Sequence, residues 1–328
     1  MSDVSDMGDV GDTPLGGWEP LLERDSVRVS RSPWGSDDTI GRLNWMTPES
    51  RGALVAAADG ARLFDLSVEF FSGMPSWTAA GDPPFHLWLT HTPDGSAVDG
   101  LTGYDREVHE KYSYCSDAMS MFMHLGTHID TLVHLGFYSM FWNGLNVREH
   151  LGSRGWAKGG AEAFPPIVAR GVLLDIARLH GVDCLPDDYA IGPGDLRKAA
   201  AAEGVELRRG DVVCIRTGRI RRWPAPEFLA VPMPGIDLAG ARFLCEEAGA
   251  MIVGADTPAL EVFPSSERAF TPVHAYMFAT AGAPIIEVLW LEELAAAGVH
   301  EFVFTGYPLR VRGATGAPLR PVAMALRR

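Results

Sequence analysis

The chain has 328 residues, 47% of them hydrophobic, which is enough to bury a large core in one big domain or two smaller ones. Its formal net charge of −14 opposes contact with a phosphate backbone, so we expect no nucleic-acid partner. No apolar run approaches the length of a membrane span, no signal peptide is recognisable and the four cysteines are far apart, so we expect a reduced, cytoplasmic protein without a membrane partner.

The first part of the chain divides into a tail and an extension. Residues 1–18 are rich in Ser, Asp and Gly and carry four aspartates and no base, which predicts a disordered acidic tail. Residues 19–60 form an N-terminal extension, in which Thr47-Pro48-Glu49 predicts the start of a helix that ends near Gly60. We expect this extension to cap the core, to pack against a neighbouring subunit or to contact substrate. No linker follows, so residues 19–328 are expected to form one domain.

The stretch from Met123 to His134 holds the densest set of candidate ligands, after a predicted strand at residues 63–68. The run MHLGTHIDTLVH places three histidines and an aspartate at even positions, namely His124, His128, Asp130 and His134. On an extended strand, alternate side chains point the same way, so all four would face one cavity. On a helix, Asp130 would lie on a different side from the first two histidines. Gly126 also favours the extended conformation.

Imidazole and carboxylate groups in this arrangement suit a divalent metal such as zinc, manganese or iron. Because the flanking residues are apolar, we expect Asp130 to be buried, and a buried carboxylate needs a partner or a metal. The alternative is that the histidines are ordinary core or surface residues, since the chain has ten. His86 and His91 lie in a polar stretch without a ligand-like neighbour, and we expect them to be non-catalytic.

The second half of the chain alternates apolar runs with helical patterns. Strands are predicted at residues 171–176, 211–218 and 250–254, with helices at 194–203 and 236–249 between them. This order predicts a mixed α/β fold with helices over a sheet. Before it, the aromatic-rich segment 136–144 either completes an apolar pocket or forms a surface hairpin around a buried tryptophan.

Two further candidates follow near the C-terminus. His274 opens a predicted helix that ends near Gly282, and Glu287 lies inside the apolar run 284–290. A lone carboxylate in such a run is costly unless it is paired, protonated or bound to a metal. The alternative for Glu287 is an ion pair with an arginine.

The motif His124-x-Gly-Thr-His128-x-Asp130-x-x-x-His134 resembles the signature of the cyclase family of metal-dependent hydrolases, which includes kynurenine formamidase and isatin hydrolase. His274, Glu287 and the residues after them also match that family, so the resemblance extends over most of residues 30–325. One departure is Leu132, where many members carry proline. Because of this departure, the subfamily to which the chain would belong stays open.

The resemblance implies a fold, a site and an assembly. The fold is a barrel-like β core with flanking helices, of the swivelling β/β/α type. The metal ligands are His124, His128 and Asp130, and His134, His274 and Glu287 either hold a second ion or act as acid/base groups. Phe71 and Trp77 would form an aromatic wall for a flat substrate, with ordinary core packing as the alternative for Trp77. The family resemblance also implies a homodimer or homotetramer.

Three functions are compatible with these residues. The first is hydrolysis of an amide or ester in a small molecule, such as a lactam, lactone or aryl formamide, by metal-activated water. The second is a metal-assisted cyclisation or dehydration in biosynthesis, because the same Lewis acid can enolise a ketone. The third is a non-enzymatic protein in which a metal stabilises structure or serves as a sensor.

Overall fold

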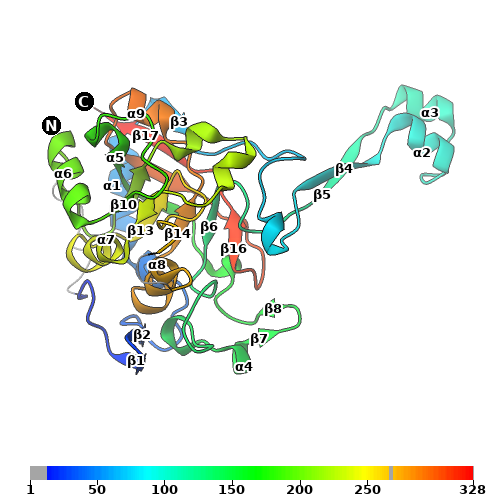
Figure 1. The fold of residues 1–328 in the computed structure, drawn as a ribbon. Helices are drawn as coiled ribbons and strands as arrows, with labels where there is room; N and C mark the ends of the chain where they lie inside the picture. The colour runs from blue at the N-terminus through cyan, green and yellow to red at the C-terminus, as the bar shows by residue number, and fades with distance from the viewer. Residues whose placement is uncertain (1–12, 266–268, 328) are drawn as a thin grey trace.

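A nine-stranded mixed sheet, curled into a half-barrel, forms the centre of the protein (Figure 1). The computed structural model describes residues 13–265 and 269–327. In spatial order the strands are β16 (Gly316–Pro318), β6 (His128–Asp130), β14 (Ile285–Glu287), β13 (Ile252–Ala255), β11 (Val212–Arg216), β9 (Ile167–Asp175), β15 (Glu301–Gly306), β17 (Val322–Leu326) and β3 (Ala58–Asp65). Strands β14, β13, β11 and β9 run parallel, and the other neighbours are antiparallel. The expected mixed α/β class is confirmed.

The parallel strands form because their residues are apolar on both faces. The sequence of β11 is VVCIR, and all five of its residues are buried. Strands covered on both faces read as continuous apolar runs. The predicted strand at residues 63–68 is wrong in its bounds, since β3 begins directly after the first helix and ends at Asp65.

Helices flank this sheet and end close to the predicted residues. The first one begins where Thr47 and Ser50 form a reciprocal capping box, and α6 ends at Gly204 in the left-handed conformation. The helices outside residues 86–120 are α1 (Pro48–Ala57), α4 (Val147–His150), α5 (Ile176–Leu179), α6 (Pro193–Glu203), α7 (Leu238–Arg242), α8 (Pro272–Ala275) and α9 (Glu292–Ala296). The π-helical turns Phe243–Glu247 and Tyr276–Thr280 continue α7 and α8.

The N-terminal extension packs against the core. Residues 1–12 of the expected tail lie outside the described residues, but Trp18 is buried and packs edge-on against Trp34 and Trp142. The guanidinium of Arg42, fully buried, donates to the carbonyls of Leu15, Cys245, Ala250 and Ala281. Because these bonds tie the extension to the second half of the chain, they support the prediction that it caps the core.

Several short strands lie outside the central sheet. They are β1 (Pro20–Arg24) with β2 (Val27–Ser30), β7 (Leu151–Gly152) with β8 (Gly155–Trp156), and β10 (Ala190–Ile191) with β12 (Gly235–Ile236). A fourth pair, β4 (His86–His91) and β5 (Ser116–Ser120), carries α2 (Pro93–Asp99) and α3 (Arg106–Lys111) at its end. Figure 1 shows this pair leaving the body of the protein, and we call residues 86–120 the arm.

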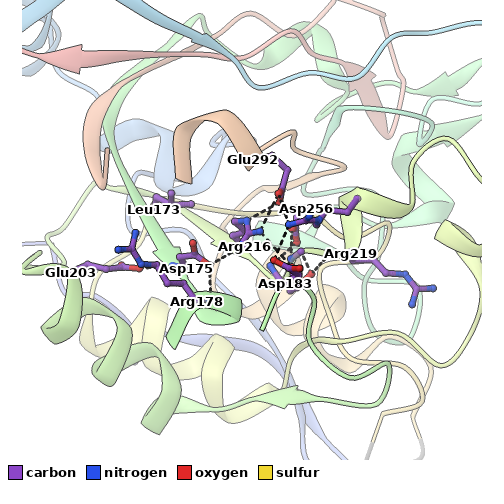
Figure 2. Close-up of polar contacts among 12 residues, drawn as sticks. Leu173, Asp175, Arg178, Asp183, Glu203, Arg216, Arg219, Asp256 and Glu292 are labelled. Atoms are coloured by element: carbon purple, nitrogen blue, oxygen red, sulfur yellow. Dashed lines mark hydrogen bonds and ion pairs between the residues drawn. The ribbon is translucent and has the colours of Figure 1, made fainter. Parts of the chain in front are cut away.

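The carboxyl ends of the parallel strands meet at one edge of the sheet, where ligands often bind in α/β proteins. At β9 and β11 this edge is closed by ion pairs, because Arg216 donates to Asp175 and, through two nitrogens, to Glu292 (Figure 2). Next to them Asp256 accepts hydrogen bonds from the loop after β11. The same edge at β14 ends in Glu287. No helix within the described residues is both long enough and apolar enough to span a membrane.

Candidate metal centre

Strand β6 carries two of the predicted ligands between β16 and β14. His128 and Asp130 are alternate residues of this three-residue strand, so they share a face, and Ile129 between them is fully buried on the other. The prediction that one continuous strand carries all four residues is wrong, because His124 precedes β6 in a bend and His134 follows it in a turn. The side chains are nevertheless brought together.

Gly126 makes the bend before β6. Its φ is +58°, and a Cβ there would lie 2.7 Å from the ring of Phe70. Only glycine tolerates that conformation and that contact without strain. The bend turns His124 back toward β6, where its Nδ1 lies 2.6 Å from Asp130 Oδ1. His128 Nε2 lies 3.3 Å from the same oxygen.

Strand β14 adds a carboxylate from the far end of the sequence. Glu287 is the register partner of His128 in the antiparallel pair β6–β14, and directly opposed residues project from the same face. Glu287 Oε2 lies 3.4 Å from His128 Nε2, and its Oε1 lies 3.0 Å from Nε2 of His274. The arginine partner considered for Glu287 is therefore replaced by two histidines.

Each of these imidazoles is held by one ring nitrogen. The ring of His128 uses Nδ1 with the carbonyl of Gly126 at 2.8 Å, and that of His124 uses Nε2 with the hydroxyl of Thr315 at 2.9 Å. The Nδ1 of His274 lies 2.5 Å from Glu261, whose carboxylate also accepts from the backbone N–H of His274. Such outer contacts fix the orientation of metal-binding histidines. The opposite nitrogen of each ring is thereby directed at the carboxylates.

Two overlapping groups of donors result. His124, His128 and Asp130 have ligand atoms within 4.8 Å of one another, and so do Asp130, His274 and Glu287. All five residues are buried, and Nε2 of His128 has no hydrogen-bond partner. A buried imidazole nitrogen that has carboxylate oxygens nearby but no hydrogen-bond partner fits a bound cation, to which the neutral ring would donate its lone pair. The donor set therefore suits one divalent ion, or two that share Asp130.

The remaining predicted residues lie at different distances from this cluster. The ring of His134 stacks on that of His124 with centroids 3.8 Å apart, and its Nε2 lies 4.0 Å from Asp130. Phe71 packs against Trp223 in a groove of about 780 Å³, whose lining contains none of these histidines. Trp77 is half-buried in the loop that follows. Contact of Phe71 or Trp77 with substrate stays a prediction.

The family described as "Putative cyclase" matches residues 64–262, which include the whole histidine motif. The chain belongs to the cyclase family. A crystal structure of a novel cyclase is 31% identical with a TM-score of 0.76, and the match covers 89% of this chain and 97% of that one. No curated protein matches the sequence.

More distant structures share the fold of this cyclase-family chain. Isatin hydrolase A from Labrenzia aggregata has a TM-score of 0.60 at 19% identity, over 85% of this chain and all of that one. A predicted metal-dependent hydrolase from Bacillus stearothermophilus has a TM-score of 0.51 at 18% identity, over 80% of this chain and 97% of the other. These likenesses extend well beyond the segment that the family model matches.

In the cyclase-family site, burial and the neighbouring charges shift the pKa values of the carboxylates and imidazoles. Burial opposes ionisation of Asp130, yet His124, His134 and His128 hold its pKa well below the ordinary value. Burial also opposes the charge on His128, but Asp130 and Glu287 raise its pKa to about 9. Burial lowers the pKa of His134 to about 3. Protonated imidazole thus balances the buried carboxylates, and a divalent ion could take over that role.

Three non-glycine residues with left-handed backbone conformation lie at the second half of this site. Leu260, Thr271 and Val288 have φ values of +50°, +44° and +57°, although none is glycine. Two of them adjoin Glu261 and Glu287, and Thr271 begins the helix that carries His274. Such residues cost on the order of 1–3 kcal/mol each and occur mostly at functional sites. At Val288, the carbonyl is held by a hydrogen bond from Thr127 at 2.7 Å.

Sequence reasoning missed Glu261, Thr315 and two aromatic rings. Glu261 stands among Ala259, Leu260 and Val262, so it carried the same signal as Glu287, a lone carboxylate in an apolar run. Thr315 carried no signal, because only the pairing of β16 with β6 brings it to His124. The rings of Phe122 and Phe278 lie 5.1 Å from His124 and 5.8 Å from His274, respectively. They supply apolar surface beside the donors.

Proposed function

We propose that this protein is a metal-dependent hydrolase that cleaves an amide or ester bond, as in a lactam, lactone or aryl formamide, with water as the nucleophile. The observation that carries the proposal is the pair of buried donor groups that share Asp130. The proteins of similar fold support it, since they include isatin hydrolases and a predicted metal-dependent hydrolase.

His124, His128 and Asp130 would hold the ion. When bound, zinc or manganese lowers the pKa of water and polarises a carbonyl group. His274 and Glu287 form the second donor group together with Asp130, where they would either complete a second ion site or act on protons. Glu261 keeps the Nε2 atom of His274 directed at Glu287 in both cases.

His134 is our candidate for proton transfer. It belongs to neither donor group, and its ring keeps 27% of its surface exposed while the donors are buried. With a pKa of about 3 the imidazole is neutral and a weak base, so it can relay a proton from attacking water at Nε2 to the leaving group but cannot store one. Phe122, half-buried next to His124, offers a flat apolar surface to an aromatic substrate.

The decisive test measures metal and turnover together. Wild type, His128→Ala and Asp130→Ala are purified, their fold is checked by circular dichroism, and bound metal is determined by elemental analysis. His86→Ala, which changes a histidine on the arm, is the matched control. We expect near-stoichiometric metal in wild type and control and strong loss in both site variants. Full retention of metal in both variants would overturn the proposal.

Activity is then screened with zinc and manganese over isatin-like lactams, formyl anilides and lactones. Turnover that disappears in His134→Ala while bound metal is kept would support the proton-transfer role. A protein that binds metal but turns over none of these compounds would favour the structural or sensing function.

Metal-assisted cyclisation is the second candidate, favoured by one structure of similar fold that is named a potential metal-dependent hydrolase with cyclase activity. Reaction in oxygen-18 water separates the two. Hydrolysis places the label in the product acid, whereas cyclisation leaves the product unlabelled.

A further inference from the structure

The groove that contains Phe71 lies where β3 ends. Its volume is about 780 Å³, and it is formed by the last residues of β3, the segment that follows them, the loop at residues 223–224, Trp290 and the start of α9. Figure 1 shows β3 and α9 next to each other at one end of the sheet. Small-molecule sites have volumes of about 300–1,000 Å³, so the groove has the size of such a site.

Aromatic rings form part of the wall of this groove. The rings of Phe71 and Trp223 stand nearly perpendicular, with planes at 79° and centroids 6.4 Å apart, so they make a corner. Trp223 and Trp290 are held in place because they pack against a small core cluster that includes Phe228 and Val288. The face of an aromatic ring is electronegative and attracts a cation, most strongly in tryptophan. Converging rings of this kind are how proteins recognise quaternary ammonium groups.

The charges of the groove have one sign. Asp65, Glu69 and Glu293 line it, and none of its lining residues in the described part of the chain is basic. Arg320 donates to Asp65 through two nitrogens and so balances that carboxylate. Glu69 and Glu293 are exposed and form no ion pair within residues 13–265 and 269–327. Two negative charges are therefore available to an occupant of the groove.

The groove is connected to the metal centre but is separate from it. None of the five donor residues lines the groove. Its residue Val68 donates a backbone hydrogen bond to the hydroxyl of Thr127 at 2.9 Å, and this hydroxyl donates to the carbonyl of Val288. Thr127 and Val288 are the sequence neighbours of His128 and Glu287. A ligand in the groove would therefore contact a set of residues different from the metal ligands.

We propose that this groove is a second binding site, which takes a small organic cation, a quaternary or protonated amine with an apolar body. The rings of Phe71 and Trp223 contact the cationic head, and Glu69 and Glu293 balance its charge. An anion would be repelled by these carboxylates, and a neutral aromatic compound would leave them without a counter-charge. The proposal depends on the lining of the groove alone, and it holds whether or not the protein is a hydrolase.

Two probes that differ only in charge test the proposal. The first is choline, which has a trimethylammonium head, and the second is the neutral alcohol of the same shape in which carbon replaces the charged nitrogen. Binding of each to the full-length protein, treated with EDTA, is titrated by saturation-transfer NMR. We expect choline to bind with a dissociation constant in the millimolar range and the neutral alcohol to bind about 10-fold more weakly. Equal binding of the two probes would overturn the proposal.

Substitutions in the groove locate the bound probe. Glu69→Gln with Glu293→Gln removes both available charges at exposed positions, so the fold should be kept. It should weaken choline binding by about 3- to 20-fold, because two partly solvated charge interactions are lost. Phe71→Leu keeps an apolar side chain but removes one ring face, at a residue that is 36% exposed. Its expected effect is about 2- to 10-fold. Neither change should alter binding of the neutral alcohol as strongly.

The matched control is Glu107→Gln with Glu110→Gln on α3, the same charge change at exposed positions of the arm, and it should bind choline as wild type does. Asp130→Ala should do so as well, and a loss there would place the cation at the metal centre instead. Binding that is unchanged in both groove variants, or weakened equally in the control, would overturn the proposal. Failure of choline and of benzyltrimethylammonium to bind wild type at millimolar concentration would overturn it too.

Discussion

Each imidazole of the donor cluster is oriented by the contact that its other ring nitrogen makes outside the cluster. His124, His128 and His274 are held by a hydroxyl, a backbone carbonyl and a carboxylate, respectively. Of these three holders only the carboxylate is charged, and it is also the shortest contact. Glu261 should therefore contribute to cation binding although it belongs to neither donor group.

Glu261→Gln should weaken metal binding by about 10- to 100-fold, because an amide cannot accept from the imidazole and the backbone as a carboxylate does. The dissociation constant is measured by titrating the metal-free protein with Mn²⁺ or Zn²⁺ alone. Glu247→Gln, at an exposed position, is the control. A variant that melts earlier but binds metal as tightly as wild type would show that Glu261 is only structural.

Asp256 is a second buried carboxylate, on the edge of the sheet where β11 and β13 end (Figure 2). It accepts from the backbone N–H and hydroxyl of Thr217 and from the N–H of Gly218. Burial outweighs these hydrogen bonds and raises its pKa from 3.8 to about 6. Between those two pH values Asp256 is protonated in the folded protein and ionised in the unfolded chain.

Stability should therefore depend on pH through Asp256. The folded state binds the extra proton, so its contribution to the free energy of unfolding increases as the pH falls through about 6 and is lost as the pH rises. Relative to Asp256→Asn, wild type should gain about 1 kcal/mol between pH 7 and pH 5. Urea unfolding of both proteins at each pH measures this. An unchanged difference would mean that Asp256 has an ordinary pKa.

At the scale of elements, the bend at residues 124–127 is what converts a short strand into a site. Strand β6 by itself presents only His128 and Asp130. The left-handed conformation of Gly126 returns the chain so that His124 joins them, and its carbonyl holds His128. The even spacing of the motif thus selected residues that do lie close together, although one continuous strand is not the reason.

Gly126→Ala should destabilise the protein by about 2–4 kcal/mol, from the positive φ and from overlap with Phe70. It should also weaken metal binding, because His124 would move. Urea unfolding gives the free energy. Gly204→Ala is the matched control, since its φ is +67° but nothing lies within 4 Å of the added methyl group. Its cost should be only about 1 kcal/mol. Equal losses at both positions would show that Phe70 imposes no constraint.

The elements themselves were largely predictable. The apolar runs at 171–176, 211–218 and 250–254 are β9, β11 and β13, and the helix at 194–203 is α6. Local rules suffice there because the runs are buried on both faces and Gly204 stops the helix. The arm was not predicted, because its alternation and short helices resemble those of any surface loop.

At the scale of the whole molecule, the metal centre joins segments that are far apart in sequence. Residues 124–130, 261, 274 and 287 meet at one edge of the half-barrel, together with residue 315. Without a cation, this edge brings three carboxylates together in a buried space. A cation bound in this space should stabilise the entire fold, because a ligand that binds only the folded state adds to the free energy of unfolding.

Removing metal with a chelator should therefore lower the melting temperature. At a metal concentration about 1,000 times the dissociation constant, the lost free energy is about 4 kcal/mol, which corresponds to roughly 10 °C in a domain of this size. Differential scanning calorimetry with and without EDTA measures the shift. Asp130→Ala, which lacks the shared ligand, should melt at the same temperature in both conditions. An identical melting temperature for wild type with and without EDTA would contradict a stabilising ion.

The sequence by itself determined the chemistry of the site and the class of the fold. A carboxylate or imidazole in an apolar run must be paired or bound to a cation wherever it folds, so His128, Asp130 and Glu287 could be recognised from their neighbours alone. Only the tertiary structure decided that Glu287 opposes His128, that Glu261 supports His274 and that an apolar arm projects from the body. Those facts depend on strand register and on contacts between distant segments, which no local pattern encodes.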